Sequence, residues 1–223
     1  MSNKPLKKSD LNKSWMKPRR DRETLLAPEN HLIVSEGTKT EPNYFCALRD
    51  EINLKYRDKI NICIPRSKET KNTISLFEYA RELVNREPGK YQHVWLVYDK
   101  DDFPSDNFDN TEKMCNSSSD DTISYHALWS NECIEYWFLL HFIYLESNLH
   151  RTEYYVRLSE KIGQTYSKNS QDMYNLLKPC LQTAIKNATA IIQKYDDGLP
   201  PSQCAPATKV YEIFEKLKPY ISS

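Results

Sequence analysis

The sequence predicts an α/β fold, in which a small parallel sheet of about four strands is flanked by helices and followed by a mainly helical C-terminal extension. Two patterns and the length support this prediction. Short apolar runs alternate with segments of helical periodicity up to about residue 150, and beyond that point the periodicity is mainly helical. The chain of 223 residues is long enough for one large domain, or for one domain with an extension.

The first strand is expected at residues 31–35, where leucine, isoleucine and valine form a short apolar run. After a turn, a helix is expected from Thr40 to about residue 55. Thr40 suits the N-cap, because its hydroxyl can accept a hydrogen bond from the first turn. Pro42 suits that first turn, because a backbone N–H there has no partner within the helix.

The next elements repeat this order. Residues 60–65 alternate apolar and polar side chains, which predicts a second strand. A second helix is expected from about residue 72, with apolar residues at helical spacing, until Pro88 and Gly89 end it. A near-continuous apolar run at 93–98 predicts a third strand. Strands that alternate with helices in this way imply right-handed crossovers and a parallel sheet.

Beyond the third strand we expect a polar, acidic loop at 101–121 with a short helix near 110–115. A fourth strand at 122–128 and an aromatic-rich helix at 132–145 follow. The extension is expected to contain three helices, at 152–164, at 170–195 with a break at Pro179, and at 207–217. We therefore divide the chain into a basic N-terminal arm (1–29), a core (30–149) and a helical extension packed on the core (150–223).

Charge is distributed unevenly along the chain. The 31 basic residues equal the 31 acidic ones, which excludes a uniformly basic or uniformly acidic protein. Residues 1–23 nevertheless carry eight Lys or Arg against three Asp or Glu, a net charge of +5, and the remainder carries −5. The N-terminal arm is either a weakly ordered segment that contacts phosphates or a solvated tail, and the sequence leaves both open.

Scarce glycine and scattered cysteine exclude several classes of protein. With 4 glycines, the chain contains no dinucleotide-binding fingerprint, no complete phosphate-binding P-loop and no Gly-x-Ser-x-Gly nucleophile elbow. The 6 cysteines include no Cys-x-x-Cys pair, so we expect reduced thiols rather than a zinc site. The N-terminus is polar, and the apolar runs are far shorter than the ~20 residues that span a bilayer, so we expect a cytoplasmic protein without a membrane partner.

Carboxylates follow two of the predicted strands. Glu36 ends the first strand, and Asp99 and Asp101 end the third. Carboxyl ends of neighbouring parallel strands meet at one edge of a sheet, so the three side chains can converge, and extended backbone would point Asp99 and Asp101 the same way. Oxygen ligands of this kind suit Mg²⁺ or Mn²⁺. The alternatives are a solvated acidic loop and, for Glu36, a helix cap.

Two lysines lie beside these acids. Lys39 belongs to a Gly-Thr-Lys-Thr turn before the first helix, and Lys100 lies between the two aspartates. Either can contact a substrate phosphate. The turn resembles the end of a P-loop but lacks its first glycine and its Gly-Lys pair. A nucleotide-binding or phosphotransfer protein therefore stays an alternative.

Glu135 and His141 are auxiliary candidates on the aromatic-rich helix. His141 can act as a proton shuttle, because its ordinary pKa lies near neutrality. Six positions separate the two residues, so they do not share a helix face. A histidine in such a helix is more often a hydrogen-bonded core residue.

Four blocks of the chain resemble the RloB-like family of the Toprim superfamily. They are Ile-Val-Ser-Glu-Gly-Thr-Lys-Thr-Glu-Pro-Asn-Tyr-Phe at 33–45, Val-Tyr-Asp-Lys-Asp at 97–101, Ser-Asn-Glu-Cys-Ile-Glu-Tyr-Trp-Phe-Leu-Leu-His-Phe at 130–142, and the weaker Ala-Pro-Ala-Thr-Lys-Val at 205–210. The resemblance spans about residues 30–217. It implies a Toprim-like core in which Glu36, Asp99 and Asp101 match the acidic residues of the family.

The resemblance also carries expectations about function. It implies that the three acids bind Mg²⁺ or Mn²⁺ and serve phosphodiester cleavage of DNA, tRNA or another RNA. It further implies a nuclease component of prokaryotic anti-phage defence that works with an ATPase partner. The alternative is a non-catalytic Toprim-like module that docks to such an ATPase, with a structural acidic cluster.

Overall fold

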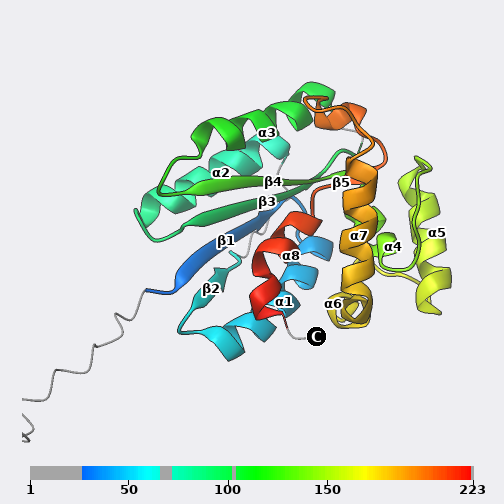
Figure 1. Ribbon diagram of the computed structural model, residues 1–223, viewed down its shortest axis with the longest axis horizontal. Helices are drawn as coiled ribbons and strands as arrows, with labels where there is room; N and C mark the ends of the chain where they lie inside the picture. The colour runs from blue at the N-terminus through cyan, green and yellow to red at the C-terminus, as the bar shows by residue number, and fades with distance from the viewer. Residues whose placement is uncertain (1–26, 66–71, 102–103, 222–223) are drawn as a thin grey trace, which may run out of the picture.

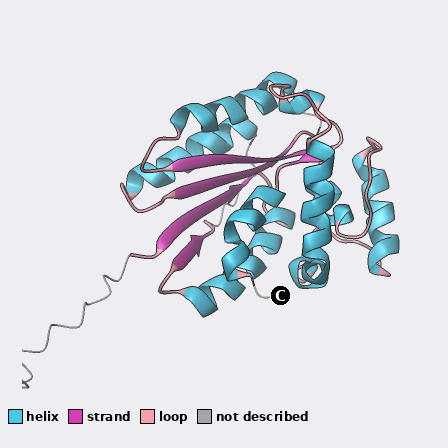
Figure 2. Cartoon of the chain, viewed as in Figure 1, coloured by secondary structure: helices cyan, strands magenta, loops and turns pink. Residues whose placement is uncertain are grey.

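The computed structural model describes residues 27–65, 72–101 and 104–221. The basic arm predicted for residues 1–29 lies outside the described residues apart from its last three positions. The described residues form one mostly parallel sheet with helices on both faces, which confirms the predicted α/β class and is consistent with a Toprim-like fold (Figures 1 and 2).

The sheet has five strands in the order β2-β1-β3-β4-β5. They are β1 (Glu29–Ser35), β2 (Ile60–Cys63), β3 (His93–Asp99), β4 (Ser124–Asn131) and β5 (Ala207–Thr208). The first four are parallel, and β5 pairs antiparallel with the end of β4. The chain order reverses between β1 and β3, the place where open α/β sheets form binding crevices.

Three helices from the first half of the chain and the last α-helix cover the two faces of the sheet. Figure 1 shows α2 (Thr73–Arg86) and α3 (Ser105–Ser118) on one face, and α1 (Thr40–Tyr56) with α8 (Tyr211–Leu217) on the other. The N-terminus of α2 is capped by Asn72, whose side chain accepts a hydrogen bond from the Ser75 N–H at 2.8 Å. No helix in the described part of the chain has the length and apolar composition needed to cross a membrane.

Most of the remaining helices gather at the carboxyl end of the strands (Figure 1). They are α4 (Ile134–Leu140), α5 (Arg151–Ile162), α6 (Met173–Leu177) and α7 (Leu181–Ile192), with short 3-10 turns at Lys178–Cys180, Pro201–Gln203 and Lys218–Tyr220. The predicted break at Pro179 is confirmed, because the first of these turns separates α6 from α7. Every residue of α4 is buried.

Several boundaries differ from the prediction. The expected acidic loop is largely α3, because Phe108, Thr111 and Cys115 recur at helical spacing and are buried, although the segment between them is polar. The fourth strand extends to Asn131, and the helix after it is shorter than expected. The helix predicted from residue 207 begins at Tyr211, after the two residues of β5.

An aromatic cluster joins α1, α4 and α8. The Trp137 indole N–H donates a hydrogen bond to the Tyr44 hydroxyl at 3.0 Å, and both side chains are fully buried. The ring of Phe214 stacks on Trp137 with centroids 5.4 Å apart. Tyr44 is therefore a core residue that fixes the start of α1 against α4. Helix α1 carries Glu41 and helix α4 carries Glu135, two acids that are described below.

Asp109 links α3 to the turn at Pro201–Gln203. Its two carboxylate oxygens accept hydrogen bonds from Ser202, one from the N–H at 2.8 Å and one from the hydroxyl at 2.7 Å. We predict that Asp109→Ala lowers the free energy of unfolding by about 2–3 kcal/mol, because two charge-assisted hydrogen bonds from Ser202 are lost.

Urea unfolding followed by circular dichroism and by tryptophan fluorescence measures this effect. Asp106→Ala, at an exposed position of the same helix, is the control and should change stability by a few tenths of a kcal/mol at most. We also expect core and extension to unfold in one transition. Two separate transitions in the wild type would show that residues beyond 150 fold independently.

Candidate active site

Strand pairing brings Glu36 next to Asp99. Strands β1 and β3 are direct neighbours, with Ser35 opposite Val97, and the Glu36 N–H donates to the Val97 carbonyl at 3.0 Å. In return, the Glu36 carboxylate accepts a hydrogen bond from the Asp99 N–H at 3.3 Å across 63 positions of sequence. The predicted adjacency of these two strand ends is confirmed.

These residues line a cavity of about 280 Å³ at the carboxyl ends of β1 and β3, which we call the acidic cavity. Its walls contain five carboxylates and two lysines: Glu36, Glu41, Asp99, Asp101, Glu135, Lys39 and Lys168. Five of the seven predicted site residues are thus brought together, and their roles stay predictions. Lys100 and His141 are not part of the lining.

Asp99 is the most constrained of these acids. One carboxylate oxygen accepts the Ile134 N–H at 3.2 Å, where α4 begins. The other is buried and has no hydrogen-bond partner among the described residues. Burial and the nearby carboxylates of Glu41, Glu135, Asp101 and Glu36 raise the pKa of Asp99 well above its ordinary value. A buried oxygen without a donor is open to a cation.

The same forces act on two neighbours. Burial raises the pKa of Glu36 to about 8, against the opposing effect of its bond from the Asp99 N–H. Burial also raises the pKa of Glu41 to about 7, with the Glu135 carboxylate adding to the shift. The acidic cavity is therefore a place where protons compete with any divalent cation.

Asp101 does not follow the extended geometry expected for it. Strand β3 ends at Asp99, and Asp101 has a left-handed backbone with φ of 39°. Its N–H donates to the Glu132 carbonyl at 3.1 Å, and its carboxylate lies 3.1 Å from the Arg151 guanidinium. The expectation that Asp99 and Asp101 point the same way through a continued strand is wrong, although both line the acidic cavity.

The extension contributes side chains that the sequence did not single out. Lys168 lines the acidic cavity, and its carbonyl accepts a hydrogen bond from the Thr40 hydroxyl at 3.2 Å. Burial opposes the charge of Lys168, but its bond to Tyr155 and the Glu135 carboxylate raise its pKa. The Tyr166 hydroxyl donates to Glu135 at 2.8 Å. The contacts to Thr40 and Glu135 join positions more than 30 apart, so no local sequence pattern predicts them.

His141 and Lys100 lie elsewhere. His141 is buried at the end of α4, where one ring nitrogen bonds the Trp137 carbonyl at 3.0 Å. Burial lowers the pKa of His141 to about 4, so the ring is neutral at physiological pH. The Lys100 N–H donates to the Ser130 carbonyl at 2.9 Å, which fixes its backbone beside β4.

Comparison with protein families matches residues 31–217 to the RloB-like proteins. The chain belongs to the RloB-like family. The matched region contains every residue that lines the acidic cavity, including Lys168 of the extension. No curated protein and no solved structure matches the chain.

The RloB-like chain has a second titratable cluster at the opposite end of the strands. Among the described residues, one group of three possible ligands has its atoms within 4.8 Å of one another, and it is Glu29, His31 and His93. The acidic cavity does not form such a group. By distance alone, this histidine cluster is a possible metal-binding group.

Hydrogen bonding argues against a metal in the histidine cluster. The Trp95 indole N–H donates to Nδ1 of His31 at 3.0 Å, so the neutral ring carries its proton on Nε2 and offers no lone pair there. Lys216 places its ammonium 3.0 Å from the Glu29 carboxylate and would compete with a metal for that carboxylate. Glu29 also precedes the matched region of the family. We interpret the cluster as structural.

Gly37 gives a direct test of the acidic cavity. A Cβ added at Gly37 would overlap the Glu41 carboxylate, which is the flexible end of a side chain, and Gly37 has no positive φ. We predict that Gly37→Ala keeps the fold but displaces Glu41, and lowers Mn²⁺ affinity about tenfold.

Thermal unfolding at increasing Mn²⁺ concentrations measures that affinity. Gly163→Ala is the control, because Gly163 has a φ of 70° at the end of α5 and open space around it. This variant should lose stability without any change in Mn²⁺ affinity. Equal Mn²⁺ affinities for Gly37→Ala and the wild type would exclude Glu41 from the site.

The histidine cluster predicts acid sensitivity. Burial and the neighbouring His93 lower the pKa of His31 from 6.5 to about 4, and the pKa of His126 is lowered to about 4 for the same reasons. Lys216 and His93 hold the pKa of Glu29 at about 2 although burial opposes this. Each folded-state pKa lies below its ordinary value, so each group stabilises the fold at neutral pH and loses that effect as pH falls.

We therefore predict that stability falls as pH drops from 6.5 to 4, with His31 contributing up to about 3 kcal/mol. Urea unfolding at several pH values measures the slope. His31→Gln keeps an acceptor for Trp95 and should flatten the curve in this window. An unchanged slope in His31→Gln would show that His31 is not the titrating group.

Proposed function

We propose that this RloB-like protein is a Mg²⁺- or Mn²⁺-dependent nuclease that hydrolyses nucleic-acid phosphodiesters. One observation carries the proposal: a buried Asp99 oxygen without a hydrogen-bond partner, in a cavity with four other carboxylates. Carboxylate oxygens are the ligands that these cations prefer. A divalent charge would offset the burial and the carboxylate repulsion that together raise the pKa values of Glu36, Glu41 and Asp99.

Asp99, Glu36 and Asp101 are the residues that would hold the cation. When bound, such a cation polarises the scissile phosphate and stabilises the leaving oxygen. Asp101 would bind the cation in competition with Arg151, whose guanidinium lies 3.1 Å from the Asp101 carboxylate. The donor set contains no sulfur or imidazole, and this fits a hard cation better than zinc.

Residues at the rim and walls of the acidic cavity would bind the substrate phosphate and transfer protons. Lys39 and Lys168 are exposed at the acidic cavity and can bind the non-bridging oxygens of a phosphate. With a pKa of about 8, Glu36 is poised to donate or accept a proton near neutral pH if it is not a ligand. Glu135 is held by Tyr166 and cannot move freely toward the substrate.

The biological setting is proposed from the family alone. We infer that the nuclease is the effector of an anti-phage defence system with an ATPase partner, and that it acts in the cytoplasm. All six cysteines are free, which fits a reducing compartment. The +5 charge of residues 1–23 would help an otherwise acidic chain approach RNA or DNA.

Two observations favour the alternative of a non-catalytic module that docks to an ATPase. Asp101 is already neutralised by Arg151, and the carboxylates of the acidic cavity are not gathered into a coordination group. The nucleotide-binding alternative has no such support. Its Gly37–Thr40 turn lines the acidic cavity, where the phosphates of a nucleotide, like those of a nucleic acid, would be repelled unless a cation is bound.

We predict that Asp99→Asn reduces metal-dependent cleavage at least 100-fold while stability without metal is unchanged or higher. The carboxamide has nearly the same shape, and it removes an acid that the neighbouring carboxylates disfavour. Labelled RNA and DNA oligonucleotides with Mg²⁺ or Mn²⁺ provide the assay, and thermal unfolding measures the stability.

Asp58→Asn, at an exposed position outside the cavity, is the matched control and should cleave like the wild type. Cleavage that persists undiminished in Asp99→Asn would refute the nuclease site. Absence of both cleavage and metal stabilisation in the wild type would favour the docking module.

A further inference from the structure

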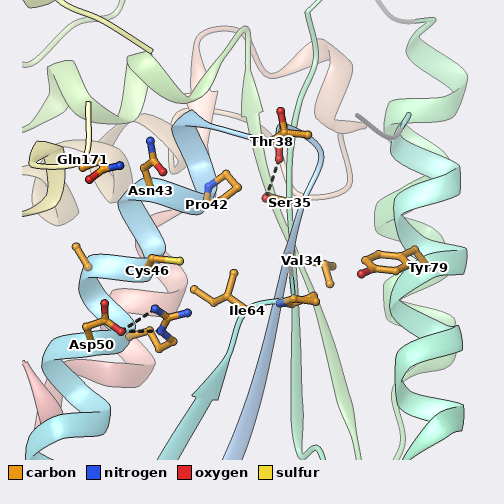
Figure 3. Close-up of a pocket in the computed structure, with 14 residues that line it drawn as sticks. Val34, Ser35, Thr38, Pro42, Asn43, Cys46, Asp50, Ile64, Tyr79 and Gln171 are labelled. Carbon is orange, nitrogen blue, oxygen red and sulfur yellow. Dashed lines mark hydrogen bonds and ion pairs between the residues drawn. The ribbon is translucent and has the colours of Figure 1, made fainter. Parts of the chain in front are cut away.

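A second, larger cavity adjoins the acidic cavity. It has a volume of about 580 Å³ and lies between α1 and α2 at the carboxyl ends of β1 and β2 (Figure 3). This volume falls in the range of ~300–1,000 Å³ that small-molecule sites occupy. We call it the neutral pocket.

The two cavities share a wall. Gly37 and Thr38, in the turn after β1, line both of them. A ligand that places a phosphate among the carboxylates can therefore extend around this turn into the neutral pocket. In a nucleotide, one sugar joins the phosphate to the base, so the two groups fit neighbouring cavities of this kind.

The charge of the neutral pocket differs from that of the acidic cavity. Its charged lining residues are Arg49 and Asp50, which form an ion pair at 2.7 Å and cancel each other. A phosphate or carboxylate would find no unpaired cation among the described lining residues. The described lining therefore favours an uncharged occupant, whereas the acidic cavity beside it is proposed to bind a cation and a phosphate.

The walls suit a flat, polar-edged ring. Figure 3 shows Tyr79 reaching from α2 toward Val34 and Ile64, which gives apolar surface on one side. Asn43 and Gln171 provide amide groups on the opposite side. Asn43 is positioned by its own amide N–H, which donates to the Asn169 carbonyl at 3.3 Å. Aromatic surface with amides at the edge is how proteins hold unpaired bases.

We propose that the neutral pocket binds a nucleobase next to the scissile phosphate, so that the substrate is single-stranded or has a base turned out of its stack. The proposal rests on the proposed nuclease function and adds its substrate class. It also supplies what the acidic cavity lacks, because five carboxylates repel a polyanion, whereas an uncharged base can be bound by stacking.

The test combines a protein variant whose neutral pocket is filled with an oligonucleotide from which one base is missing. Ala47 lines the neutral pocket from α1, and Ala47→Phe should fill it without contacting the carboxylates. Leu54→Phe on the same helix, where Leu54 is 84% exposed, is the matched control. Binding of fluorescent single-stranded RNA and DNA is measured by anisotropy with Ca²⁺ as the cation, and an abasic residue is moved along the oligonucleotide.

For the wild type and Leu54→Phe, we expect one abasic position to weaken binding roughly 5- to 150-fold, the range of one base-stacking contact. Ala47→Phe should bind the intact strand as weakly as the abasic strand, and Tyr79→Ala should fall between them. The melting temperature of each variant, measured with and without Mn²⁺, shows that the fold and the acidic cavity are intact.

The outcomes separate the pocket from the nuclease. The nucleobase pocket is overturned if the wild type cleaves but no abasic position weakens binding, or if Ala47→Phe binds the intact strand as tightly as the wild type. The nuclease proposal is unaffected by that result. Base-dependent binding without metal-dependent cleavage supports the pocket and overturns the nuclease. Equal affinity for duplex and single strands overturns the proposed substrate class, and absence of nucleic-acid binding overturns both proposals.

Discussion

The repulsion among carboxylates buried at the junction of β1 and β3 is the constraint on which the rest of the site depends. Parallel pairing fixes Glu36 and Asp99 so closely that the carboxylate of one accepts the backbone N–H of the other at 3.3 Å. Glu41 and Glu135 join them from α1 and α4, and both are buried. Such a cluster costs free energy unless protons or a cation neutralise it.

The extension offsets part of this cost. Arg151 neutralises Asp101, Tyr166 donates to Glu135, and Lys168 adds a positive charge at the rim. All three come from α5 and the loop after it, and the Thr40 hydroxyl anchors that loop to the start of α1. Residues beyond 150 therefore belong to the site as much as to the scaffold. The match to the RloB-like family includes all three residues and continues to residue 217.

Local sequence patterns predicted most strands and helices, whereas several features of the site depend on contacts between distant positions. Strand β1, helix α1 and strand β3 follow from periodicity, and their ends placed Glu36 and Asp99 in one cavity. The turned backbone of Asp101 was not predictable, because residues other than glycine seldom adopt positive φ. Lys168 was missed because its position depends on a hydrogen bond across 128 residues. Helix α3 was missed because polar residues separate its buried positions.

In the proposed nuclease, the acidic cavity would recognise the substrate by charge and the neutral pocket would recognise it by shape. The acidic cavity can engage a phosphate only with a cation present, so its affinity for a polyanion is conditional. In the neutral pocket, Arg49 and Asp50 are paired, so the described lining would select a proposed ligand by stacking and by amide hydrogen bonds. Gly37 and Thr38 lie between the two, so a ligand can satisfy both only if its phosphate and its ring are adjacent. An unpaired nucleotide within a strand meets that condition, whereas a stacked duplex does not present its bases in this way.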